Sequence, residues 1–155
     1  MWALMCPSAV VAETIGHLRI AGRGERECVV LWLGRRGADG IDIQEARRPW
    51  QTAWRDRFHI PPNETAAVKV YLRERRLIIA AQVHSHPGKA FHSAADDIGA
   101  VIRHVGALSF VIPWFASQTS VSSFLSDVAL SELQEDNAWH EIPAGSLDTK
   151  CRMIA

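Results

Sequence analysis

The sequence predicts an α/β fold, a single domain over residues 1–155 with a central mixed β-sheet flanked by helices. Its length of 155 residues, 48% of them hydrophobic, is enough for one domain with a full core. Strongly apolar runs typical of buried strands occupy residues 28–33, 77–83 and 108–113. Segments of helix-forming composition lie between these runs, and strands and helices in this order favour helices packed on one sheet.

Periodicity and terminal residues define the other elements. Apolar residues at helical spacing predict helices at residues 8–22, 63–76 and 93–102. Ser8 and Ser93 are expected to cap the first and third of these helices. Gly37 and Gly40 predict a hairpin turn after the first buried strand, leading into a paired strand that begins at Ile41.

Two regions are less regular. Residues 49–62 hold Trp50, Trp54 and Phe58, which are expected to contact the core, although exposed rings would suit a binding surface. Residues 121–125 predict a more polar strand near an edge. The segment 130–142 fits either a strand or a helix.

Charge and composition exclude several classes of protein. Lys plus Arg and Asp plus Glu both total 17, so a net charge of zero argues against nonspecific nucleic-acid binding. Arginines cluster at residues 35–36, 47–48 and 73–76; we expect solvated faces there, with an acidic protein partner as the alternative. Three cysteines are too few for a disulfide framework. Neither a signal peptide nor a membrane helix is predicted, so a cytoplasmic location without a membrane partner is expected.

The segment that indicates chemistry is His84-Ser85-His86-Pro87, directly after the buried run 77–83. Side chains two residues apart on a strand share a face, so both imidazoles can converge beyond the strand end. Asp96 can return to the same point after a loop. Two His and one Asp, with a fourth position left to water, are the ligand set of a catalytic zinc ion.

Hydrolysis at such a site needs a base that takes a proton from water. Glu27 is the best candidate, because a carboxylate at the start of an apolar strand is unusual unless it faces a site. Glu25 would share its face and is the alternative. Ser93 either donates a hydrogen bond to the oxyanion of the reaction or serves only as a helix cap.

These residues resemble the motifs of the JAMM metalloprotease family, also called JAB or MPN-plus, over nearly the whole chain. The resemblance implies the MPN fold, which is cytidine-deaminase-like. It also implies that His84, His86 and Asp96 bind zinc, that Glu27 is the acid/base residue, and that Ser93 orients water or the oxyanion.

The chain departs from the family pattern in one loop. Seven residues usually separate the second His from the Ser, whereas six, residues 87–92, do so here. Counting from the Ser selects Asp96 as the ligand, and counting from the His selects Asp97. Asp96 is preferred, because a Ser-x-x-Asp helix start sets the direction of its carboxylate.

The resemblance to the prokaryotic branch implies a zinc-dependent isopeptidase or peptidase, similar to deubiquitinases, that cleaves after the C-terminus of a ubiquitin-like protein. Its expected partners are that substrate or its conjugate and the E1-like and E2-like proteins of a bacterial conjugation or antiviral defence system. The alternatives are a peptidase that processes a sulfur-carrier protein, a DNA-repair relative, which the neutral charge disfavours, and a noncatalytic MPN-type binding module.

Overall fold

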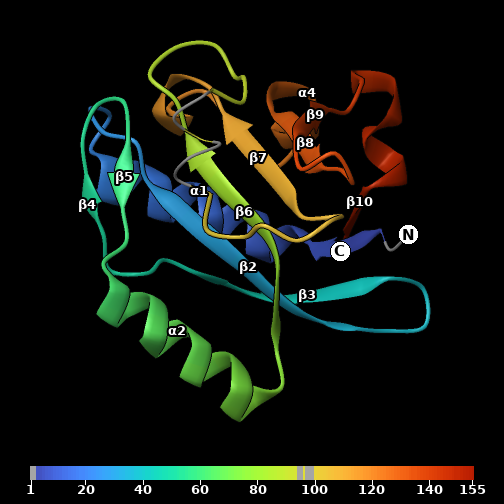
Figure 1. The fold of residues 1–155 in the computed structure, drawn as a ribbon. Helices are drawn as coiled ribbons and strands as arrows, with labels where there is room; N and C mark the ends of the chain where they lie inside the picture. The colour runs from blue at the N-terminus through green and yellow to red at the C-terminus, as the bar shows by residue number, and fades with distance from the viewer. Residues whose placement is uncertain (1–2, 94–95, 97–99) are drawn as a thin grey trace.

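The computed structural model describes residues 3–93, 96 and 100–155. These residues form an eight-stranded sheet with the order β10-β1-β3-β2-β6-β7-β8-β9 (Figure 1). Its strands are β1 (Leu4–Pro7), β2 (Val29–Arg36), β3 (Ile41–Arg47), β6 (Ile78–Ser85), β7 (Leu108–Ile112), β8 (Ala129–Leu133), β9 (Trp139–Glu141) and β10 (Cys151–Ile154). Because β2 and β6 are antiparallel while β6 and β7 are parallel, the predicted mixed sheet is confirmed.

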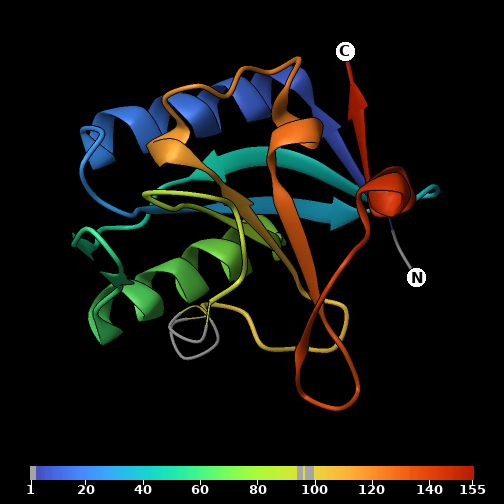
Figure 2. The same cartoon turned by 90° about the horizontal axis from the view of Figure 1, so that it is seen from above.

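Helices α1 (Ser8–Gly22) and α2 (Pro62–Arg75) lie on opposite faces of this sheet (Figure 2). Both helices agree with the sequence prediction, but the proposed cap at Ser8 is wrong. Strand β1 runs directly into α1, so Pro7, the last strand residue, takes the capping position and makes no side-chain bond. No helix of the described residues is long and apolar enough to cross a bilayer.

Alternate residues of β2 pack into two cores. Val30 and Trp32 belong to the core beneath α1, whereas Val29 and Leu31 pack toward Val68 of α2. Side chains of a strand alternate between faces, and both faces of β2 are covered. This double burial explains why the run from residue 28 to 33 is apolar throughout.

The strand predicted at residues 121–125 is wrong. Turn residues lead there into a short helix, α4 (Phe124–Asp127). The ring of Phe124 lies 5.7 Å from the rings of both Trp32 and Phe110, and Val121 and Leu125 pack against the same core. Packing from a turn and a short helix therefore accounts for the apolar signal. The ambiguous segment 130–142 forms part of β8 and all of β9 instead.

The aromatic segment forms a small hairpin outside the main sheet. Strands β4 (Thr52–Ala53) and β5 (Phe58–His59) pair with each other. Trp50 is 66% exposed and Trp54 is 39% exposed, so the expected core contact is wrong for both. Phe58 does pack, against the core beneath α2. The hairpin therefore anchors through one ring and presents the other two to solvent.

Two short 3₁₀ helices complete the fold. η1 (Trp114–Ala116) follows β7 directly and lies beside the end of β6. η2 (Ala144–Thr149) leads into β10, which pairs in parallel with β1. The end of the chain therefore closes one edge of the sheet, while the loops after β6 and β7 gather at the end where β6 finishes.

Candidate metal centre

The candidate site lies where β6 ends beside the start of β2. The pairing of these antiparallel strands continues one residue beyond β2, because the Ser85 amide donates to the Cys28 carbonyl at 3.2 Å. The Cys28 amide also donates to the Ser85 hydroxyl at 3.4 Å. Since side chains alternate along each strand, Glu27, His84 and His86 point to the same face.

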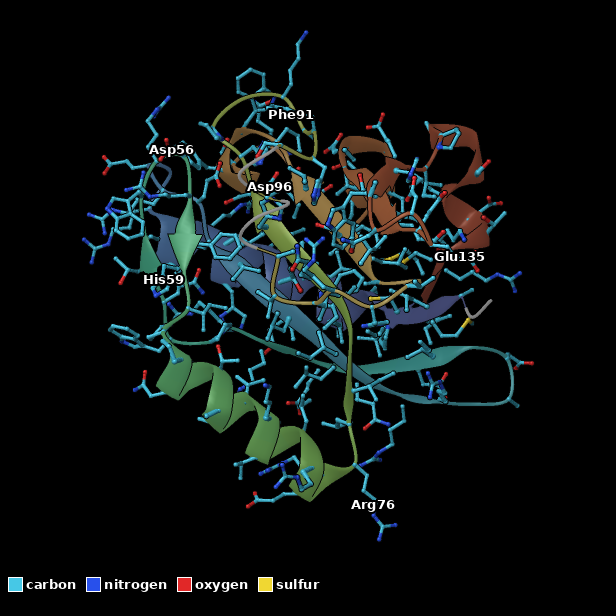
Figure 3. All side chains as sticks on the ribbon, in the orientation of Figure 1. Asp56, His59, Arg76, Phe91, Asp96 and Glu135 are labelled. Carbon is cyan, nitrogen blue, oxygen red and sulfur yellow. The ribbon has the colours of Figure 1, made fainter. Side chains whose placement is uncertain are left out.

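Asp96 lies against both imidazoles. Its Oδ1 is 3.0 Å from Nε2 of His84, and its Oδ2 is 3.1 Å from Nε2 of His86. One ligand atom from each of the three residues lies within 4.8 Å of the others, and all three side chains are buried. Figure 3 marks Asp96 at the end of the sheet where β6 finishes. The structure thus brings together the three residues predicted to bind zinc.

Ser93 holds the Asp96 carboxylate through a reciprocal pair of hydrogen bonds. The Ser93 amide donates to Oδ2 of Asp96 at 2.7 Å, and the Asp96 amide donates to the Ser93 hydroxyl oxygen at 3.1 Å. This is the capping geometry that a Ser-x-x-Asp sequence predicts. The hydroxyl oxygen of Ser93 accepts this hydrogen bond. Its O–H proton is the group that would donate to an oxyanion.

The alternative ligand Asp97 lies outside the described residues, as does Ile98. The predicted helix does not extend to Val101 and Ile102, which are not helical. Instead, the Val101 amide donates to Oε1 of Gln82 at 2.9 Å. Gln82 is buried in β6 and needs polar partners, so this bond ties the loop to the sheet.

Glu27 completes the cluster from the other strand. Its Oε1 lies 3.8 Å from Nε2 of His86, and the side chain is 3% exposed. Its Oε2 makes no hydrogen bond to any described residue. An unpartnered buried carboxylate oxygen is costly for stability and suits a chemical role. The alternative base, Glu25, is exposed.

The surroundings of Glu27 and Asp96 shift the pKa values of their carboxyl groups in opposite directions. Burial raises the pKa of Glu27 to about 7, against the opposing effect of His86, and Asp96 and Asp56 add to the increase. Burial alone would also raise the pKa of Asp96, but the adjacent imidazoles and the Ser93 amide hold it well below its usual range. One carboxyl group is therefore a permanent anion and the other a proton acceptor near neutrality.

His86 is oriented by its surroundings. Burial on its own lowers the pKa of its imidazole. The hydrogen bond and charge of Asp96, together with Glu27 and a backbone hydrogen bond with Lys89, outweigh this effect, so the pKa of His86 is raised above its usual value. A ring held through one nitrogen presents the other nitrogen in a defined direction.

The donor set fits a divalent transition metal. Zinc is a borderline acid that accepts both imidazole nitrogens and carboxylate oxygens as ligands. Neither ring nitrogen of the buried His84 has a hydrogen-bond partner among the described residues, although Nε2 is close to Asp96. Unsatisfied buried nitrogens are costly unless they bind a ligand. With three protein donors, such a site leaves one coordination position for water or substrate.

Other histidines make different contacts. His92, which the sequence places in the loop, stacks on the Trp139 ring at 4.8 Å. His17 pairs with Glu13, and His140 pairs with Asp136. In the part of the chain that the structure describes, the group able to hold a metal ion consists of His84, His86 and Asp96.

Sequence reasoning missed the aromatic rings that pack on the two imidazoles. The Phe91 ring meets His86 edge-on at 4.9 Å and 82°, and the Phe58 ring lies 5.9 Å from that of His84. Neither the loop that carries Phe91 nor strand β5, which carries Phe58, has a pattern that distinguishes these rings from ordinary apolar residues. The two imidazoles that these rings contact are buried, with His84 0% and His86 3% exposed.

The turn η1 is a second feature that sequence reasoning missed. Its three residues all have left-handed φ angles, of 55°, 51° and 61°. The first two amides donate to the carbonyls of Gly88 at 3.1 Å and His86 at 2.8 Å, so the turn supports the backbone of a candidate ligand. This conformation strains residues other than Gly. None of the three is Gly, so the sequence offers no signal for it.

Arg19 of α1 stabilises this strained turn through two hydrogen bonds. Its Nε donates to the Ala116 carbonyl at 2.8 Å, and its Nη2 donates to the Thr119 carbonyl at 2.7 Å. Charge-assisted bonds to two carbonyls can offset backbone strain. Residues from α1, η1 and the loop after β6 therefore act together on the position of His86.

Comparison with known proteins agrees with this geometry. A family model described as prokaryotic homologs of the JAB domain matches residues 7–123, a range that includes the whole candidate site. The "Probable metalloprotease y4jG" of Sinorhizobium fredii is 34% identical over 145 residues, covering 91% of this chain and 88% of that protein.

Two solved structures share the fold at 18% sequence identity. A solution structure of a Desulfitobacterium hafniense protein has a TM-score of 0.69, covering 97% of this chain and 92% of that one. A solution structure of a Salinibacter ruber protein has a TM-score of 0.57, with 90% and 89% covered. The family match over most of the chain, around a buried group able to hold a metal ion, shows that this protein belongs to the prokaryotic homologs of the JAB domain.

Proposed function

We propose that this protein is a zinc-dependent isopeptidase or peptidase that cleaves after the C-terminus of a ubiquitin-like protein, either to release it from a conjugate or to mature its precursor. The observation that carries the proposal is the buried His-His-Asp group with Glu27 at 3.8 Å from His86. The family and the relative named a probable metalloprotease support the peptidase class.

In this proposal His84, His86 and Asp96 hold the zinc ion. The bound ion would supply Lewis acidity, which polarises a scissile carbonyl and makes water acidic near neutral pH. Asp96 contributes a full negative charge, because its carboxyl group stays ionised. Ser93 keeps that carboxylate in place through its amide.

Glu27 acts as the general base and then as the acid. Its carboxylate takes a proton from the attacking water and delivers it to the leaving amine. A pKa of about 7 suits both steps, since the group can accept and release a proton at neutral pH. The Ser93 hydroxyl donates to the oxygen that becomes negative at the attacked carbonyl.

The partners follow from the reaction. The substrate is a ubiquitin-like protein or its conjugate, whose extended, glycine-ended tail can approach the site closely. E1-like and E2-like enzymes of a bacterial conjugation or antiviral defence system would form the bond that this protein breaks in the cytoplasm.

The test uses fusions of ubiquitin-like proteins to a reporter through their native C-terminal tails. The purified protein loaded with zinc should release the reporter, with the cut after the tail located by mass spectrometry. A chelator and the variant Glu27→Gln should each abolish release. If Glu27→Gln cleaves at the parent rate, the proposed role of Glu27 is wrong. Failure to cut any such fusion while other peptides are cut would contradict the substrate class.

A further inference from the structure

We propose that the tip of the β4–β5 hairpin, residues 54–57, docks an acidic surface of the protein substrate beside the candidate site. This inference rests on the proposed function, because it concerns the partner of the same site. The proposed partner is a protein with acidic side chains around the bond to be cut.

The hairpin tip is attached directly to the site. The Glu27 amide donates to the Trp54 carbonyl at 2.7 Å, and the Trp54 amide donates to the Arg57 carbonyl at 2.8 Å. At the base of the tip, the Phe58 ring packs 5.9 Å from the ring of His84. In Figure 3, Asp56 marks this tip on the same end of the molecule as Asp96. A partner held by the tip would therefore lie against the site.

Aromatic rings hold the two arginines of the tip in place. The guanidinium of Arg57 lies over the ring of Trp54 at 4.5 Å, and that of Arg55 lies 5.7 Å from the ring of Phe115. Phe115 in turn donates its amide to the His86 carbonyl at 2.8 Å. Both arginines are exposed. Positioned but solvent-facing guanidinium groups lose little entropy when they bind carboxylates.

The charge of the tip is only partly neutralised within the protein. Among the described residues, the ion pair recorded for the tip joins Arg57 and Asp56 at 3.7 Å, with side chains 60% and 75% exposed. Such an exposed pair contributes little and exchanges readily with a partner's groups. Two guanidinium groups and one carboxylate leave the tip positive.

The tip belongs to a basic half of a protein that is neutral overall. Residues 1–76 contain 13 of the 17 basic and 9 of the 17 acidic residues, so the remainder is acidic by a similar margin. Strand β9 lies at the other side of the sheet and carries the exposed Glu141, and the exposed Glu135 and Asp136 lie just before this strand. In Figure 3, Asp56 and Glu135 lie on opposite sides of the molecule. This separation would orient an acidic partner toward the tip.

Exposed rings also lie close to the candidate site. Trp54 of the tip and Phe91 are 39% and 53% exposed. The Trp54 carbonyl accepts from the Glu27 amide and the Phe91 ring packs on His86, so the two rings come from separate segments that both contact the site. Arginine and aromatic residues dominate the binding energy of protein interfaces. A nucleic acid fits less well, because the acidic half of the chain would repel its phosphates.

The experiment measures binding, which does not depend on cleavage. The probes are a fluorescent peptide of Glu, Leu and Gly, the same peptide with Gln in place of each Glu, and a labelled oligothymidylate. The full chain should bind the acidic peptide about tenfold more tightly than the other two probes at low salt, and the preference should shrink as salt is added.

The variant R55E/R57E should weaken binding of the acidic peptide by about tenfold or more, and R55Q/R57Q by a smaller factor. The matched control is R73E/R76E, which makes the same charge change on exposed arginines at the far end of α2 (Figure 3) and should alter binding less than about twofold. Equal losses in R55E/R57E and R73E/R76E, equal binding of the Glu and Gln peptides, or tighter binding of the oligothymidylate would overturn the proposal. Binding that follows these expectations without any cleavage would support it and count against the proposed function alone.

Discussion

Glu27 Oε1 lies 3.8 Å from Nε2 of His86, although the two residues are 59 positions apart in the sequence. Antiparallel pairing of β2 and β6 brings them together. Cys28 and Ser85, the residues next to Glu27 and His86, are joined by a backbone hydrogen bond. The acid/base candidate and a candidate ligand are thus positioned by sheet register, which a shift of one residue would destroy.

We expect Glu27→Gln to lower the cleavage rate by about 10²–10⁴-fold, because a neutral amide cannot accept the proton of water. Metal content should be retained, since Glu27 is not among the candidate ligands. Glu25→Gln, at an exposed carboxylate nearby, is the matched control and should stay within about twofold of the parent rate. Cleavage assays and elemental analysis of both variants check this prediction.

Asp96→Asn should weaken metal binding by more than about 100-fold, because it removes the anionic ligand that contacts both imidazoles. Asp97→Asn, the same chemical change at the neighbouring position, should retain the metal. Chelator competition followed by metal analysis separates the two assignments. Metal loss in Asp97→Asn with retention in Asp96→Asn would transfer the ligand role to Asp97.

The metal-free protein should lose stability as the pH rises through the neutral range. Burial raises the pKa of Glu27 from 4.5 to about 7, so between these values the folded state binds more protons than the unfolded state. The free energy of unfolding then falls with increasing pH above 4.5 and levels off above pH 7. This contribution is on the order of 3 kcal/mol.

Urea unfolding of the metal-free protein across this pH range measures the effect. Glu27→Gln has no carboxyl group at this position, so its stability curve should lack the part of the decline that Glu27 contributes and should lie above that of the parent at high pH. The decline due to the raised pKa of His86 should remain in both proteins. Parallel curves for the two proteins would contradict the assignment.

Arg19→Met should destabilise the turn η1 and, through it, the backbone of His86. The change removes bonds of 2.8 and 2.7 Å to two carbonyls, so a loss of about 2 kcal/mol in the free energy of unfolding is expected. Metal affinity should fall as well, because the Phe115 amide would no longer hold the His86 carbonyl firmly. Arg23→Met, which removes an exposed charge at the end of the same helix, is the control. Equal stability and metal affinity in the two variants would count against this coupling.

Some of the sequence predictions failed for identifiable physical reasons. Trp50 and Trp54 were expected to contact the core, but the hairpin is anchored through Phe58 and leaves both indoles exposed. Residues 121–125 have the composition of a strand, yet Phe124 reaches the core from a helical turn. Composition reports that a side chain is buried, and it does not report the backbone conformation that buries it.

The sequence by itself determined the α/β class, the buried strands and the identity of the residues in the candidate centre. These features are local: apolar runs mark β2, β6 and β7, and the spacing of His84, His86, Ser93 and Asp96 places donors at a strand end and at a predicted helix start.

Only the tertiary structure decided which carboxylate faces His86, which rings cover the imidazoles and how the left-handed turn is held. Glu27 was preferred over Glu25 on the strength of its strand position, but its burial and raised pKa arise from residues distant in the chain. Arg19, Phe91 and Phe115 act through contacts between separate segments. Such contacts depend on sheet register and loop path, which local sequence patterns do not encode.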